Sequence, residues 1–478
     1  MQSIRLIVIL LCVVLFSSCE KELDLLPTDL ISEANVFQSV ADLEKGLYGV
    51  YGALPGENDM FVNAVVSDET KLSNENRGQG QFEFKWQYTA ADGGLASATW
   101  DNYYYLIGLA NKVLIASDNV KASSQADINL KNQIKGELLA LRAFAHFQML
   151  QCFSGRYQPG KLGIPYTSTS DIAAKPARAS ASSVIAAIEN DLAAAVATPT
   201  IPDAPLAVPS AGLIRLSKAS IAGIRARVAL YKASGLPEGD AIEEWNNAKN
   251  FALEAITKSG KSLAVGTEYA DLWTDDNESE LIFKLRRTGS SVGRLWQDNN
   301  GNVFFEPSDK LKSLFNRTKD RRFPIFFKIN SNPDEDTCLV NKFFESSRGP
   351  KIVDVKMMRV SEMYLIIAEA NAELNDLAGA AQYYNDLRRN RINGYINENF
   401  LTKSEAIENI YNERARELCF EGFRYYDHIR RGLIIDRFES DVQSFNWKTL
   451  SATDHRMIFP IPQTSTIANP NMVQNPNY

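Results

Sequence analysis

The chain of 478 residues contains few of the side chains that usually build disulfide frameworks or metal sites. It has five cysteines, two of them within the first 19 residues, which leaves Cys152, Cys338 and Cys419 without a CxxC spacing. The three histidines are far apart in the sequence. Neither a set of disulfides nor a zinc site is indicated by this pattern. We expect no bound metal.

Catalytic motifs are missing as well. The sequence has no GxSxG, HExxH, P-loop or Rossmann glycine pattern in its required context. Asp427 and His428 are neighbours, so on a helix they would point about 100° apart and could not form a dyad. A pair of glycosidase carboxylates is not excluded by sequence, because the chain has 58 acidic residues. We expect a protein without catalytic activity and without a cofactor.

The charge balance is acidic, with a formal net charge of −7. An acidic surface repels phosphate groups, so nucleic acid is a poor candidate partner. Hydrophobic residues make up 45% of the chain and charged residues 23%, which is typical of a globular protein with a large core.

A long apolar run is also absent, because the longest one near the amino terminus, Leu6 to Phe16, is too short to span a bilayer. It follows Arg5 and precedes two serines and Cys19, a pattern similar to a lipoprotein signal peptide over residues 1–18. An ordinary secretory signal is the alternative. A lipidated Cys19 would anchor the chain to a membrane. The acidic stretch that follows predicts a flexible tether over residues 19–35.

Apolar residues at steps of three and four predict a mostly α-helical protein. The predicted helices are Val36–Tyr51, Trp100–Ser117, one along Ile134 to Met149 that closes at Gly155, Val184–Ala197, Leu213–Ser234 and Ile242–Lys258. A helix–turn–helix pair is predicted over residues 356–391, with its turn at Asn375 and Asp376. Paired helices of about 34 residues indicate tetratricopeptide-like units that present a broad surface. Four prolines exclude a helix over residues 199–212, and Glu280–Leu285 is expected to form a strand.

One further helix is predicted from Glu413 to Gly432, with the sequence ERARELCFEGFRYYDHIRRG. An apolar stripe follows one face, and charges of opposite sign follow the other at spacings that allow pairing along the helix. Gly422 lies in its middle, where glycine costs roughly 1 kcal/mol relative to alanine. Close approach of a neighbouring helix is the expected reason.

Two non-helical stretches combine aromatic side chains with Gly, Asn and Gln: Asn74–Trp100 within residues 58–100, and Gly293–Pro307 within residues 262–350. Sugar-binding surfaces use this mixture, because a ring stacks on a pyranose while amides and charges bind its hydroxyls. The candidate ligand-binding residues are Asp68, Asn74, Asn76, Arg77, Trp86, Tyr88 and Trp296. In the alternative interpretation, Phe82, Phe84 and Trp86 form the packed face of a hairpin.

The Glu413–Gly432 segment resembles the signature helix of the SusD/RagB family of surface nutrient-binding lipoproteins. The segment GELLALRAFAHFQMLQCFSG, the repeat RVSEMYLIIAEA, Asp320 with Arg322, and the ending NPNMVQNPNY are also similar to this family. The resemblance implies a tetratricopeptide-like scaffold with an irregular, loop-rich ligand subdomain. It implies an N-terminal helical region over residues 36–258 and a C-terminal region over residues 259–478, whose signature helices, within residues 356–432, serve the scaffold rather than the ligand.

The resemblance also implies a function. We expect a lipoprotein exposed on the outer membrane that captures a nutrient without cleaving it, most simply a glycan. The ligand would pass to a SusC-like TonB-dependent transporter. Two alternatives stay open: capture of peptides, as in the RagB branch of the family, and a structural lid on the transporter without ligand specificity of its own.

Overall fold

The computed structural model describes residues 36–478 apart from residues 92, 172, 209–212 and 330–337. The predicted signal peptide, the lipidation site Cys19 and the tether over residues 19–35 lie outside the described residues, and they stay predictions. In the described part of the chain, no helix has both the length and the apolar character that crossing a membrane would need.

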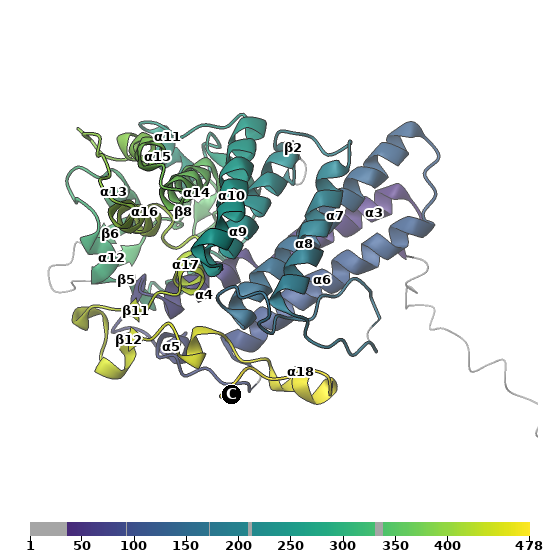
Figure 1. Cartoon of the computed structure of the whole chain (residues 1–478), viewed down its shortest axis with the longest axis horizontal. Helices are drawn as coiled ribbons and strands as arrows, with labels where there is room; N and C mark the ends of the chain where they lie inside the picture. Colours follow the sequence, from purple (N-terminus) through teal and green to yellow (C-terminus); the bar gives the residue numbers. More distant parts are fainter. Residues whose placement is uncertain (1–35, 92, 172, 209–212, 330–337) are drawn as a thin grey trace, which may run out of the picture.

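The protein is mostly α-helical, as predicted, and its long helices pack side by side (Figure 1). One half contains α3 (Val40–Gly52), α6 (Leu95–Asn119), α7 (Gln125–Ser154) and α8 (Ala181–Ala197). The other half contains α14 (Val360–Glu373), α15 (Leu377–Arg389) and α16 (Lys403–Glu417), and between the halves lie α9 (Lys218–Gly235) and α10 (Glu238–Ser259). Consecutive helices such as α6 and α7, α9 and α10, and α14 and α15 contact each other. The helix–turn–helix pair predicted over residues 356–391 is confirmed as α14 and α15.

Shorter helices and strands lie in the stretches between the long helices. The helices are α4 (Gly56–Val66), α5 (Gln81–Phe84), α11 (Glu268–Trp273), α12 (Asp309–Ser313), α13 (Arg322–Phe326), α17 (Arg424–Arg431) and α18 (Gln463–Ala468). The strands pair in antiparallel twos: β1 (Thr70–Leu72) with β5 (Phe305–Pro307), β2 (Leu206–Val208) with β3 (Leu213–Arg215), β4 (Leu281–Leu285) with β10 (Val355–Arg359), β6 (Phe327–Ile329) with β7 (Cys338–Val340), β8 (Glu345–Ser346) with β9 (Gly349–Pro350), and β11 (Ile435–Asp436) with β12 (Thr449–Leu450).

Two predicted boundaries are wrong for identifiable reasons. The helix expected from Leu213 begins at Lys218, because Ser217 forms a capping box with Ser220 and residues 213–215 pair as a strand. Residues 58–66, expected to be non-helical, lie in α4, where most side chains are buried on every side of the helix. A helix that is buried on every side, here with the polar Asp59 and Asn63 among its buried residues, gives no amphipathic period for the sequence to reveal.

The predicted helix from Glu413 to Gly432 is broken. It ends as α16 at Glu417 and resumes as α17 at Arg424, with Phe420 at φ 62° and Gly422 at φ 89° between them. Gly422 is therefore a turn residue and not a mid-helix residue. The expected close approach is confirmed, because a Cβ on Gly422 would lie 3.3 Å from the backbone of Asp59 in α4.

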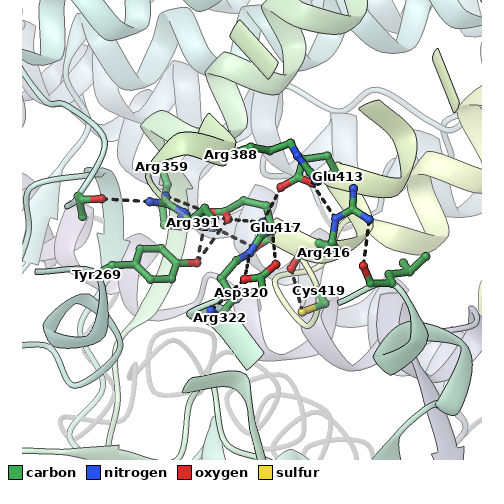
Figure 2. Close-up of polar contacts among 12 residues, drawn as sticks. Tyr269, Asp320, Arg322, Arg359, Arg388, Arg391, Glu413, Arg416, Glu417 and Cys419 are labelled. Atoms are coloured by element: carbon green, nitrogen blue, oxygen red, sulfur yellow. Dashed lines mark hydrogen bonds and ion pairs between the residues drawn. The ribbon is translucent and has the colours of Figure 1, made fainter. Parts of the chain in front are cut away.

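Glu417, the last residue of α16, lies at the centre of a buried ion-pair network (Figure 2). Its carboxylate accepts hydrogen bonds from Arg322 Nη1 at 3.1 Å, from Arg359 Nη1 at 2.9 Å and from Arg391 Nε at 3.1 Å. Burial alone would raise the pKa of Glu417, but the three guanidinium groups hold it well below its ordinary value. The charges expected to pair along one helix thus connect four separate segments.

Glu413 extends this network to the neighbouring helices. Its carboxylate accepts from Arg322 Nη1 and Arg388 Nη1, both at 2.6 Å, and from Arg416 Nε at 2.7 Å. The side chain of Glu413 is fully buried. Glu413 and Glu417 of the signature segment therefore hold the scaffold together and are not accessible to a ligand.

Candidate ligand-binding site

The short strand pair β1–β5 brings the two predicted ligand stretches together. Thr70 to Leu72 run antiparallel to Phe305 to Pro307, and the N–H of Ser73 continues the pairing by donating to the Phe304 carbonyl at 3.2 Å. The loops that leave this ribbon, residues 73–80 and 297–303, therefore lie against each other. We call these two loops the amide rim.

Side chains fasten the two loops of the amide rim to one another. Asn76 Nδ2 donates to the Phe304 carbonyl at 3.0 Å. Arg77 Nη2 donates to Asn302 Oδ1 at 3.1 Å, across a sequence separation of 225 residues. Asn74 and Arg77 are exposed and Asn76 is half-buried. Polar groups from both predicted stretches are thus held together at the surface.

The second loop of the rim is closed by Asp298. Asp298 Oδ1 accepts from the backbone N–H of Asn300 at 2.8 Å and of Asn302 at 2.9 Å, while Asn302 Nδ2 donates to Asp298 Oδ2 at 2.6 Å. The side-chain hydrogen bond from Asn302 lowers the pKa of Asp298. Gly301 supplies the positive φ of 91° that this turn needs. These hydrogen bonds fix the position of Asn302, whose Oδ1 accepts the hydrogen bond from Arg77.

An exposed aromatic residue follows the first loop of the rim in the sequence. Phe82, in the single-turn helix α5 directly after the first rim loop, is 66% exposed. Gln81, its neighbour, donates from Nε2 to Asn76 Oδ1 at 3.1 Å, which attaches α5 to the rim. The site therefore combines an exposed ring with amides and a guanidinium group.

The three aromatic residues predicted to bind the ligand are buried, so this part of the prediction is wrong. Trp86 is 1% exposed and donates its indole N–H to the Val66 carbonyl at 2.9 Å. Tyr88 is 8% exposed, with its hydroxyl on the Arg456 carbonyl. Trp296 is 2% exposed and packs 5.4 Å from Phe420, centroid to centroid. Rings covered by protein on both faces cannot stack on a sugar.

Asp68 is likewise a scaffold residue. Its carboxylate accepts from Arg424 Nε at 2.7 Å and Nη2 at 3.0 Å, and it also pairs with Lys310 at 2.9 Å and His428 at 3.2 Å. Burial by itself would raise the pKa of Asp68, but Arg424 and His428 bring it well below its ordinary value. Asp68 thus secures α17 to the segment after α4, and its proposed contact with a ligand is corrected.

The aromatic pattern of this segment does not reveal which of its rings is exposed. Phe82, Phe84 and Trp86 alternate with polar residues, which suggests a strand with all three on one face. The chain instead makes the one helical turn of α5, which leaves Phe82 outside and buries Phe84. The glycines at positions 78 and 80, both with positive φ, were the available signal that extended backbone ends before Phe82.

The comparisons with known proteins agree with this architecture. Residues 328–478 match the model of the SusD family, and residues 21–230 match a family described as starch-binding and associating with the outer membrane. Among curated proteins, two SusD-like proteins of Formosa agariphila are similar to the chain: one is 23% identical with 98% of each chain covered, and the other is 22% identical with 96% of this chain and 95% of the relative covered.

Solved structures share the fold. A SusD superfamily protein from Bacteroides thetaiotaomicron superposes with a TM-score of 0.79 at 23% identity, covering 92% of this chain and 100% of that one. A SusD-like carbohydrate binding protein from Bacteroides vulgatus gives a TM-score of 0.74 at 23% identity, covering 91% and 98%. The two family models, both of SusD proteins, together match most of the sequence, and the chain belongs to the SusD/RagB family.

Proposed function

We propose that this protein captures a glycan at the amide rim, on the outer face of the outer membrane, without cleaving it. The observation that carries the proposal is the rim itself, in which hydrogen bonds join two loops from opposite halves of the chain. The exposed Phe82 lies in the helical turn that directly follows the first loop. The family's description as starch-binding and associated with the outer membrane supports the same ligand class and location.

The composition of the rim suits capture followed by release. A phenyl ring offers an apolar face to a pyranose, and the exposed side chains of Asn74 and Arg77 can hydrogen-bond its hydroxyls. The amide of Asn76 is occupied within the rim, where it holds the two loops together. Such a site gains little from buried charge, so we expect modest affinity. Release would deliver the glycan to a SusC-like TonB-dependent transporter, with the protein held nearby through a lipid on Cys19. The transporter partner and the lipid anchor are parts of the proposal.

Substitution of the exposed ring tests the site. We expect Phe82→Ala to weaken retardation on polysaccharide gels roughly threefold to tenfold, because a stacked ring contributes about 0.5–1.5 kcal/mol. Arg77→Ala should weaken it as well, because it removes hydrogen-bond donors from the rim. Native affinity electrophoresis in gels containing soluble starch, xylan or pectin measures this. Phe445→Ala is the matched control, since Phe445 is 73% exposed and lies outside the rim.

Three results would contradict the proposal. Equal loss in the Phe445→Ala control would show a nonspecific surface effect. Binding of a peptide digest in place of any polysaccharide would favour peptide capture. A protein that binds neither, yet still associates with its transporter in detergent extracts, would favour the structural lid.

A further inference from the structure

A groove lined by residues other than those of the amide rim lies elsewhere on the protein. It has a volume of about 550 Å³ and lies between α6, residues 165–171 with Ala174 and Pro176, and α18 with the tail that follows. Its walls include the rings of Tyr104 and Tyr166, the hydroxyl run Thr167 to Ser170, and Asn469. This volume is within the range of small-ligand sites.

Gly108 forms part of the floor of this groove, in the interior of α6. A Cβ built on Gly108 would meet no atom within 4 Å, and its backbone is helical, so neither packing nor conformation requires glycine there. Glycine in a helix interior costs about 1 kcal/mol relative to alanine. The position keeps open a space that any larger side chain would begin to fill.

Buried groups hold the wall of the groove rigidly in place. Tyr166 stacks on His146 with ring centroids 4.1 Å apart, and the backbone N–H of Thr167 donates to His146 Nε2 at 3.1 Å. His146 Nδ1 lies 2.9 Å from the Arg142 carbonyl, so it carries the proton of a neutral ring. Burial lowers the pKa of His146 to about 3, which keeps the ring neutral at physiological pH.

A buried ion pair supports the same wall. Arg142 binds Asp191 through two hydrogen bonds of 2.7 Å, and the Tyr166 hydroxyl also bonds Asp191. Asn111 accepts from Arg142 at 2.9 Å and donates to the carbonyls of Thr167 at 3.2 Å and Thr169 at 3.1 Å. A site whose supporting residues are fixed in this way needs little reorganisation on binding.

Several backbone carbonyls along the groove already accept hydrogen bonds, and this indicates which class of ligand the groove takes. The carbonyls of Thr167 and Thr169 are bound by Asn111, that of Pro165 by the Tyr104 hydroxyl at 2.8 Å, and that of Pro176 by Asn469 at 2.8 Å. A peptide that adds as a strand needs open backbone groups of this kind. The groove offers ring surfaces and side-chain hydroxyls, which suit the faces and hydroxyls of a sugar.

We propose that this groove is a second glycan-binding site, which takes a pyranose unit against Tyr104 and Tyr166 with its hydroxyls toward Thr167 to Ser170. The ligand class is the one proposed for the amide rim, so the inference rests on that function. A chain bound at two separate sites would be held more tightly than at either one.

The test fills the groove without touching its supporting residues. We expect Gly108→Leu to weaken retardation by soluble starch, xylan or pectin at least threefold, and to weaken it further when combined with Phe82→Ala. Thermal stability should be unchanged or higher, because leucine favours a helix more than glycine does. Gly52→Leu in α3 is the matched control, since a Cβ there also meets nothing within 4 Å.

Oxidation of Met472, which lines the groove, provides a second readout. We expect the retained polysaccharide to slow hydrogen peroxide oxidation of Met472 in the wild type and not in Gly108→Leu. Full retardation of Gly108→Leu together with unprotected Met472 would overturn the groove while leaving the rim intact. Protection by a peptide digest alone would replace the glycan with a peptide. Absence of wild-type retardation in all three gels would defeat both proposals.

Discussion

Glu69 is a carboxyl group buried at 1% exposure beside the segment that joins α16 to α17. It accepts a hydrogen bond from the backbone N–H of Phe420 at 3.1 Å, and none of the ion pairs among the described residues includes it. Burial raises the pKa of Glu69 to about 8. At neutral pH the folded protein therefore keeps a proton here that the unfolded chain releases.

This proton gives a pH-dependent stability with a definite sign. The unfolded carboxyl ionises near pH 4.5 and the folded one near pH 8, so the folded state loses stability as pH rises between these values, by up to about 1.4 kcal/mol per pH unit. We expect Glu69→Gln to remove this slope. Urea unfolding of both proteins at pH 5 and pH 8 measures it, and a stability difference between the two that stays constant with pH would contradict it.

Arg437 shows what a sequence cannot reveal about single residues. It is fully buried, stacks 3.8 Å from the Phe84 ring and 4.3 Å from the Trp86 ring, and donates to the carbonyls of Val65 and Val66. Trp86 is buried because it covers this guanidinium group. Composition alone favoured Trp86 as a binding ring, since indoles and amides occur together both in sugar sites and in packed cores.

At the scale of elements, helices with one apolar face were predictable and their interruptions were not. The turn at Asn375 was found from its residues, and Asn375 indeed has a φ of 62°. The break between α16 and α17 was missed because Leu418 and Gly422 continue the apolar spacing through it. The partners of the buried charges are also not predictable from spacing, because charges spaced for pairing along one helix can equally pair with charges on other helices.

The break itself can be tested at Gly422. We expect Gly422→Ala to lower the free energy of unfolding by roughly 1–3 kcal/mol, because φ is 89° and the new Cβ would press on the backbone of Asp59. Guanidinium denaturation measures the change. Gly52→Ala, where a Cβ meets nothing, should be neutral or stabilising. Equal effects at the two sites would mean that the turn is not strained by a side chain.

For the whole molecule, the segment around α4 links the two ends of the chain. Asn63 Oδ1 accepts from the N–H of Tyr426 at 3.0 Å, and Asp68 pairs with Arg424. These contacts join residues more than 350 positions apart. The division into residues 36–258 and 259–478 stays a prediction about the sequence, while the buried core is continuous across it.

We therefore expect residues 259–478 expressed alone to lack a cooperative thermal transition, because α17 would lose the partners that neutralise Arg424 and cover Tyr426. Co-expression with residues 19–258 should restore a protease-resistant complex. Circular dichroism and limited proteolysis provide the measurements. A sharp melt of the isolated C-terminal piece would refute this interdependence.

The ribbon β1–β5 has a consequence for how such proteins diversify. Its pairing runs through main-chain atoms, which depend little on the identity of the side chain; Pro307, at the end of β5, lacks only the N–H. Residues 74–80 and 298–302 beyond it can therefore drift after gene duplication without disturbing the frame. If the amide rim binds the ligand as proposed, paralogues can acquire new ligands by changes in these loops alone, while the helical scaffold stays the same.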